Sequence, residues 1–224
     1  MLYEILKPVA LGLLRAGFRL RVTGREHVPL TGPALLVSNH VSVLDPPIVG
    51  AASPRALYFL AKEELFGVPL FGRFIRALHA RPVRRDGSDT RALKTALALL
   101  GENRAILLFP EGTRGVEGRL GAAKPGAGML AVMSGAPVVP VCVAGTGRAL
   151  PPGRALPRPT RVEVRFGPPL HFKITRDERR KERYREATDE MMRAIEQLLG
   201  EPQARRTDTK MRPSGREHLG DITQ

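Results

Sequence analysis

The stretch ALLVSNHVSVLD, residues 34–45, decides the fold of this chain. It begins as an apolar run typical of a buried strand and passes directly into polar residues. A second stretch of the same layout, LLFPEGTR, occupies residues 107–114. Because open α/β sheets build their sites where strands end, we expect the two polar segments to meet at one edge of a sheet.

Strand and helix patterns alternate along the rest of the chain. Strands are predicted at residues 20–22, 34–38, 56–60, 82–83, 105–109, 138–143 and 161–166. Helices are predicted at residues 2–20, 43–51, 89–101, 126–134 and 176–199, with mixed helix and turn at 62–78. This alternation predicts a single α/β domain, whose mixed and mostly parallel sheet is flanked by helices.

The predicted N-terminal helix carries two apolar faces. Leu13 belongs to a stripe at helical spacing, whereas Leu11, Leu14 and Phe18 fall near the opposite side, among basic residues. One face can pack on the protein body. The other either meets a membrane interface as part of an amphipathic helix or stays exposed on an ordinary packed helix.

The chain divides into three predicted parts. Residues 1–20 form the amphipathic helix, residues 21–200 form the α/β domain, and the polar, aperiodic residues 201–224 are expected to be disordered. No apolar run reaches the roughly 18 residues that a spanning helix needs, and no secretory signal pattern is present. We therefore predict no membrane-spanning helix from these patterns.

The chain is strongly basic, with 36 Lys and Arg residues against 22 Asp and Glu residues and a net charge of +14. Residues 201–224 hold nearly equal numbers of each, so the excess belongs to the predicted folded part. A basic body suits nucleic acid, an anionic membrane or a phosphorylated substrate. An aromatic content of 5% without Trp disfavours base stacking on nucleic acid. The single cysteine, Cys142, excludes an internal disulfide and a cysteine-rich metal site.

His40 and Asp45 are the candidate catalytic pair. A carboxylate on one ring nitrogen of an imidazole fixes its tautomer, and the other nitrogen can then take a proton from an alcohol. The alternative is a merely hydrogen-bonded His40 with Asp45 on a solvated face. Since no Gly-x-Ser-x-Gly nucleophile motif occurs, a catalytic His40 implies direct transfer to a bound alcohol without a covalent enzyme intermediate.

The second motif supplies candidate groups for binding a phosphate. Arg114 can bind a phosphate through paired hydrogen bonds, and Glu111 can hold either the loop or a substrate hydroxyl. Gly112 permits a tight turn between them. Lys124 precedes a glycine-rich helix start, where backbone amides can hold an anion, although an ordinary surface turn is the simpler interpretation.

Taken together, four blocks of this chain resemble the lysophosphatidic acid acyltransferase family of glycerolipid acyltransferases. The first is NHVSVLDP at residues 39–46, and the second comprises KEEL at 62–65 with Pro69, Gly72 and PVRR at 82–85. The third and fourth are FPEGTR at residues 109–114, and KPGAG at 124–128 with APVVPV at 136–141. The resemblance covers residues 21–166 and implies a glycerol-3-phosphate acyltransferase-like fold.

The resemblance implies transfer of an acyl group from acyl-CoA or acyl-carrier protein to the sn-2 hydroxyl of 1-acyl-glycerol-3-phosphate, without a further cofactor or metal. By this resemblance His40 is the base and Asp45 its partner. The acceptor and its phosphate are held by Arg85, Glu111, Gly112, Thr113 and Arg114, with support from Lys124.

Two alternatives remain open from the sequence. The acceptor of the same chemistry can be another lysophospholipid, a lyso-aminolipid or glycerol 3-phosphate. The chain can also be a non-enzymatic basic module that binds nucleic acid or an anionic membrane, in which case His40 has no role. The enzyme hypothesis predicts lysophospholipid and thioester partners, no nucleic acid, and a peripheral place on the cytoplasmic face of the cell membrane.

Overall fold

The computed structural model describes residues 2–83, 89–174 and 179–200. Within these ranges, seven strands form one sheet in the order β1-β7-β6-β2-β5-β3-β4. The strands are β1 (Arg21–Thr23), β2 (Ala34–Ser38), β3 (Leu57–Lys62), β4 (Ala80–Val83), β5 (Ala105–Leu108), β6 (Val138–Ala144) and β7 (Glu163–Phe166). The predicted tail at residues 201–224 lies outside the described residues.

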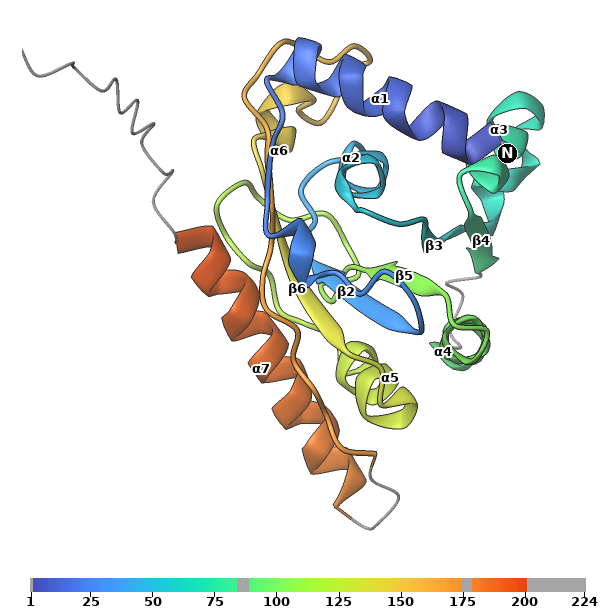
Figure 1. Ribbon diagram of the computed structural model, residues 1–224, viewed down its shortest axis with the longest axis vertical. Helices are drawn as coiled ribbons and strands as arrows, with labels where there is room; N and C mark the ends of the chain where they lie inside the picture. The colour runs from blue at the N-terminus through green and yellow to red at the C-terminus, as the bar shows by residue number, and fades with distance from the viewer. Residues whose placement is uncertain (1, 84–88, 175–178, 201–224) are drawn as a thin grey trace, which may run out of the picture.

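Helices connect most of these strands and cover the sheet. They are α1 (Leu2–Phe18), α2 (Asp45–Ala52), α3 (Pro69–Ala77), α4 (Asp89–Gly101), α5 (Gly126–Ser134), α6 (Thr146–Ala149) and α7 (Arg180–Gly200). The described residues also include the short 3-10 helices η1 (Arg25–His27) and η2 (Glu63–Gly67). In Figure 1, α1 and α2 lie on one side of the sheet, and α5 and α7 lie on the other.

The sheet is mixed and mostly parallel, so the predicted fold class is confirmed. Strands β6, β2, β5, β3 and β4 are parallel to one another. Strand β7 pairs antiparallel with β6, and β1 pairs parallel with β7, so these two strands run against the other five. The reversal has a consequence for α1, because β1 starts where the five parallel strands end. The C-terminal end of α1 therefore lies at the same edge of the sheet as the residues that follow β2 and β5.

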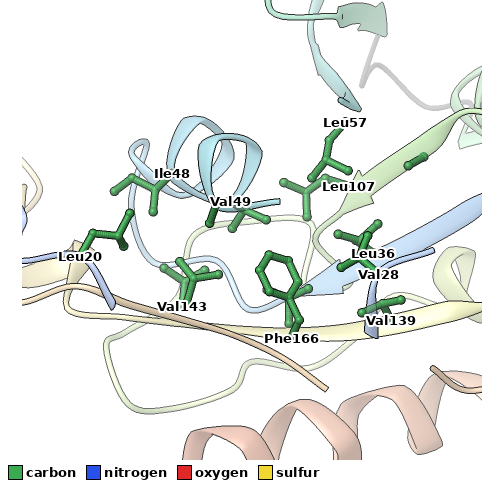
Figure 2. Packing of buried hydrophobic residues seen from close by; sticks show 14 of the residues in the cluster. Leu20, Val28, Leu36, Ile48, Val49, Leu57, Leu107, Val139, Val143 and Phe166 are labelled. Atoms are coloured by element: carbon green, nitrogen blue, oxygen red, sulfur yellow. The ribbon is translucent and has the colours of Figure 1, made fainter. Parts of the chain in front are cut away.

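Two apolar layers sandwich the sheet. On β2, Leu36 joins the cluster beneath α1 and α2, whereas Leu35 joins the cluster beneath α4, α5 and α7. Figure 2 shows the first cluster, in which Ile48 and Val49 of α2 face the sheet. Both faces of β2 are covered, so successive residues of this strand are apolar and do not alternate with polar ones.

The face of α1 that packs on the body is the one containing Leu11, Leu14 and Phe18. On the same helix, Val9 and Leu13 are 55% and 69% exposed. The predicted two-sided character of this helix is therefore present in the structure, with one side packed and the other side bare. None of the helices in the described ranges combines the length and apolarity that crossing a bilayer requires.

Most of the predicted strands and several helices differ from the observed bounds by one or two residues at one or both ends. The helix expected from residue 43 starts at Asp45, and the strand expected from residue 161 starts at Glu163. Helix α6 was not predicted, because its four residues are too few positions to show a helical period. Part of the helix expected from residue 176 lies outside the described residues, and α7 begins at Arg180.

The helices α5 and α7 approach closely at Gly128. A Cβ atom at Gly128 would collide with the backbone carbonyl of Tyr184, whereas a Cβ atom at Gly126 would meet no atom within 4 Å. The glycine at position 128 therefore serves helix packing, since its position leaves no room for a side chain.

We expect Gly128→Ala to lower the free energy of unfolding by about 3 kcal/mol, because backbone atoms cannot move aside as a flexible side chain can. Gly126→Ala, in the same helix turn, is the matched control and should leave stability equal or raise it by up to about 1 kcal/mol. Urea unfolding of both variants measures the difference. Equal stabilities would contradict this account of the α5–α7 contact.

Candidate active site

The two polar segments predicted to meet at a strand edge do meet there. Strands β2 and β5 pair with Val37 opposite Leu108, so their C-terminal ends lie side by side. The next residues bring the rings of His40 and Phe109 into a stack, with 4.1 Å between centroids and 22° between planes. Phe109 therefore supports one face of the imidazole.

The Asp45 carboxylate holds the other end of that imidazole. Its Oδ2 lies 2.9 Å from Nδ1 of His40 and accepts backbone N–H groups from Val41 at 2.7 Å and Ser42 at 2.8 Å. The Asp45 side chain is fully buried, and that of His40 is 18% exposed. Because Asp45 is the first residue of α2, its carboxylate reaches back across the loop and not along a helical turn. The alternative of a solvated Asp45 is wrong.

The imidazole is arranged to accept a proton at Nε2, the ring nitrogen that does not contact Asp45. A carboxylate only accepts hydrogen bonds, so the Asp45 contact places the proton of the neutral ring on Nδ1. No described residue forms a hydrogen bond with Nε2. A nitrogen with a free lone pair, on a ring held by stacking and by a carboxylate, can accept a proton from a hydroxyl group.

Glu111 is a brace between the two motifs. Its Oε1 accepts the backbone N–H of His40 at 3.0 Å, and its Oε2 accepts that of Gly121 at 2.7 Å. The side chain is buried, and Cβ atoms at Gly115 or Gly121 would lie 2.9 and 2.7 Å from Oε2. The sequence left two roles open for Glu111, holding the loop or holding a substrate hydroxyl. These contacts support the first role.

These carboxylates also occupy the backbone amides nearest the imidazole. The N–H of His40 goes to Glu111, and those of Val41 and Ser42 go to Asp45. An oxyanion formed beside His40 therefore has to find its hydrogen-bond donor at another amide or side chain.

Two of the basic residues predicted to bind phosphate, Arg114 and Lys124, lie beside this brace. Gly112 has a left-handed backbone conformation with φ 70°. The Lys124 side chain passes over this glycine, since a Cβ atom added at Gly112 would lie 2.8 Å from Cε of Lys124. Thr113 and Arg114 are exposed on the same loop. The side chain of Arg114 has no hydrogen bond or ion pair with any described residue, whereas Arg85 falls outside the described ranges.

Two further side chains secure the site, and no role had been predicted for either. The Asn39 amide exchanges two hydrogen bonds of 2.8 Å with the backbone of Val143, which ties the end of β2 to β6. Glu117 accepts the N–H groups of Gly145 at 2.6 Å and Gly147 at 2.9 Å, which ties the Arg114 loop to the start of α6. The first contact joins residues that lie 104 positions apart, so no local pattern could reveal it.

Comparison with known proteins decides the family. The sequence model of the family described as Acyltransferase matches residues 19–144. This chain belongs to the acyltransferase family. The matched residues include the His40–Asp45 pair and the whole Glu111–Lys124 loop, so the site lies inside the shared region.

Several relatives of this acyltransferase are similar along much of its length. A 1-acyl-sn-glycerol-3-phosphate acyltransferase of Bacillus subtilis is 30% identical over 83% of this chain and 89% of its own. The chloroplastic enzyme LPAT1 of Arabidopsis thaliana is 34% identical over 61% of this chain. That match covers 39% of the plant protein, so the chain spans about two fifths of the length of this relative.

The fold is also similar to a solved structure. The crystal structure of the 1-acyl-sn-glycerophosphate acyltransferase PlsC from Thermotoga maritima aligns with a TM-score of 0.70 and 28% identity. The alignment covers 89% of this chain and 82% of that one.

Within the described ranges of the present chain, no three His, Cys, Asp or Glu side chains gather as a metal site.

The hydrogen bond to Asp45 predicts the tautomer of His40. We expect the neutral imidazole to carry its proton on Nδ1, as does His27, whose Nδ1 lies 2.8 Å from the carbonyl oxygen of Phe166. Ring nitrogen shifts in ¹⁵N NMR spectra distinguish the two tautomers. Asp45→Asn should change the pattern of His40 and leave that of His27 as it was. A wild-type His40 protonated on Nε2 would refute the arrangement.

Proposed function

We propose that this chain transfers a fatty acyl group from an acyl thioester to the sn-2 hydroxyl of 1-acyl-sn-glycerol-3-phosphate, which gives phosphatidic acid. The observation that carries the proposal is the His40–Asp45 contact of 2.9 Å beside a loop that presents Arg114. The Bacillus subtilis and Thermotoga maritima relatives are named as acyltransferases of this acceptor, which supports the choice of acceptor.

His40 acts as the general base of this reaction. As the acceptor oxygen attacks the thioester carbonyl carbon, Nε2 takes the hydroxyl proton, and Asp45 stabilises the resulting imidazolium. The tetrahedral intermediate then collapses, the carbon–sulfur bond breaks, and the imidazolium returns the proton to the leaving thiolate. The acyl group passes directly from thioester to alcohol, so the enzyme needs no nucleophile of its own.

Arg114 is the leading candidate for binding the acceptor phosphate. Its guanidinium is exposed and, within the described ranges, unpaired, and Lys124 lies over Gly112 on the same loop. A guanidinium can donate two parallel hydrogen bonds to a phosphate, which fixes the headgroup relative to His40. Thr113 and Arg85 are proposed to assist, as the family resemblance implies.

The substrates suggest where the enzyme works. A lysophospholipid resides in membranes and the donor, acyl-CoA or acyl-carrier protein, is water-soluble, so the enzyme should act at a membrane surface. We place it peripherally on the cytoplasmic face of the cell membrane. The exposed Val9 and Leu13 of α1 provide an apolar side for that attachment.

Replacement of His40 tests the chemistry. We expect His40→Ala to lower kcat by at least about a thousandfold, because the proton acceptor is lost. His171→Ala, which replaces an exposed histidine, is the control and should retain turnover. Transfer of labelled acyl groups to 1-acyl-glycerol-3-phosphate measures both. An active His40→Ala enzyme with unchanged circular dichroism would remove the base assignment.

Replacement of Arg114 tests the phosphate contact. We expect Arg114→Ala to raise KM for 1-acyl-glycerol-3-phosphate about tenfold with a smaller change in kcat, because a charge-assisted contact to the substrate is lost. Arg119→Ala is the matched control, since Arg119 is an exposed arginine of the same loop. The same KM for both variants would count against a phosphate site at Arg114.

A further inference from the structure

A cluster of large apolar side chains is exposed on η2 and α3. Its members are Leu65 at 41%, Val68 at 52%, Leu70 at 81%, Phe71 at 44% and Phe74 at 52% exposure. We refer to these five residues as the η2–α3 patch. Scattered exposed apolar residues are common on proteins, but a group of five with two phenylalanines within one short segment is typical of an interaction surface.

The patch is exposed although α3 itself is packed against the protein body. The opposite side of α3 is buried, because Ile75 packs with Phe66 and Ala80 in a small core cluster. Residues 70, 71 and 74 fall on the other side of the helix, since a helical turn takes 3.6 residues. The patch is thus presented on a helix that the protein body already holds.

The position of the patch relates it to the active site. Strand β3 is parallel to β5, with Phe59 opposite Leu107, so η2 begins at the edge of the sheet where Pro110 and Glu111 follow β5. The same edge carries His40 and the C-terminal end of α1. In Figure 1, α3 is drawn at the corner where α1 begins.

Basic side chains accompany the patch. Arg73 and Arg76 of α3 are exposed, and Arg76 lies with its guanidinium carbon 5.2 Å from the centre of the Phe66 ring. Helix α3 contains no acidic residue, while Glu63 and Glu64 occupy the start of η2. Apolar side chains beside arginines match an interface that is anionic outside and apolar beneath, which describes the headgroup region of a bilayer with anionic lipids.

We propose that the η2–α3 patch is a membrane-insertion element, which binds bilayers containing anionic lipids and acts in addition to α1. Leu70, Phe71 and Phe74 enter the acyl boundary, and Arg73 contacts lipid phosphates. The proposal rests on the proposed function, because an enzyme whose acceptor lies in a membrane has to bind the membrane surface. Vesicle binding requires no turnover, so a failure of the patch can be told from a failure of the reaction.

The test is cosedimentation of the full chain with vesicles of phosphatidylcholine and phosphatidylglycerol. We expect Leu70→Ser combined with Phe74→Ser to weaken partitioning about tenfold, because two apolar side chains lose their burial in lipid. Leu30→Ser is the matched control. Leu30 is 69% exposed but precedes β2, at the opposite edge of the sheet. Equal losses for the control and the patch variant, or no loss for either, would overturn the proposal.

A charge variant distinguishes lipid from other occupants. Arg73→Gln should weaken binding to the anionic vesicles about fivefold and leave binding to phosphatidylcholine alone unchanged, whereas Arg91→Gln on α4 should change neither. Sedimentation velocity without lipid tests for a second copy of the chain as the occupant. A wild-type dimer that the Leu70 and Phe74 replacements dissociate would overturn the proposal, and a wild-type monomer supports it.

Discussion

The parallel pairing of β2 with β5 is the constraint on which the site depends. Val37 and Leu108 lie opposite each other in this pair of strands, which brings the residues that follow the two strands into contact. His40 stacks on Phe109 as a direct result. Parallel strands end at a common edge, so two motifs that are seventy residues apart in the chain form one surface. The apolar layers on both faces then hold this pairing in place.

Two buried carboxylates turn that surface into a rigid site. Asp45 holds the imidazole and two amides, and Glu111 joins the amides of His40 and Gly121. Both acidic groups are therefore engaged with the protein itself. The exposed positive charges of the Arg114 loop are left to face the solvent, an arrangement that favours an anionic ligand.

The sequence predicted those features that are local or periodic. The bounds of β2 and α5 agree with the prediction, because a continuous apolar run and a short glycine-rich helix both have clear ends. The His40–Asp45 contact followed from spacing and chemistry. The roles of Asn39 and Glu117 did not, since their partners on β6 and α6 become neighbours only after the sheet has formed. Likewise, nothing in an apolar pattern tells which of two apolar faces of α1 will pack, and only the core contacts decide it.

The contacts of Glu111 carry a consequence for how this protein can change. Oε2 occupies the space that side chains at Gly115 and Gly121 would need. These three positions are therefore coupled in a mutational sense, and their substitutions should be strongly non-additive. A library randomised at Gly115 or Gly121 alone should return mainly glycine, whereas new combinations become accessible only when position 111 varies with them. In directed evolution of this loop, positions 111, 115 and 121 therefore have to be varied together.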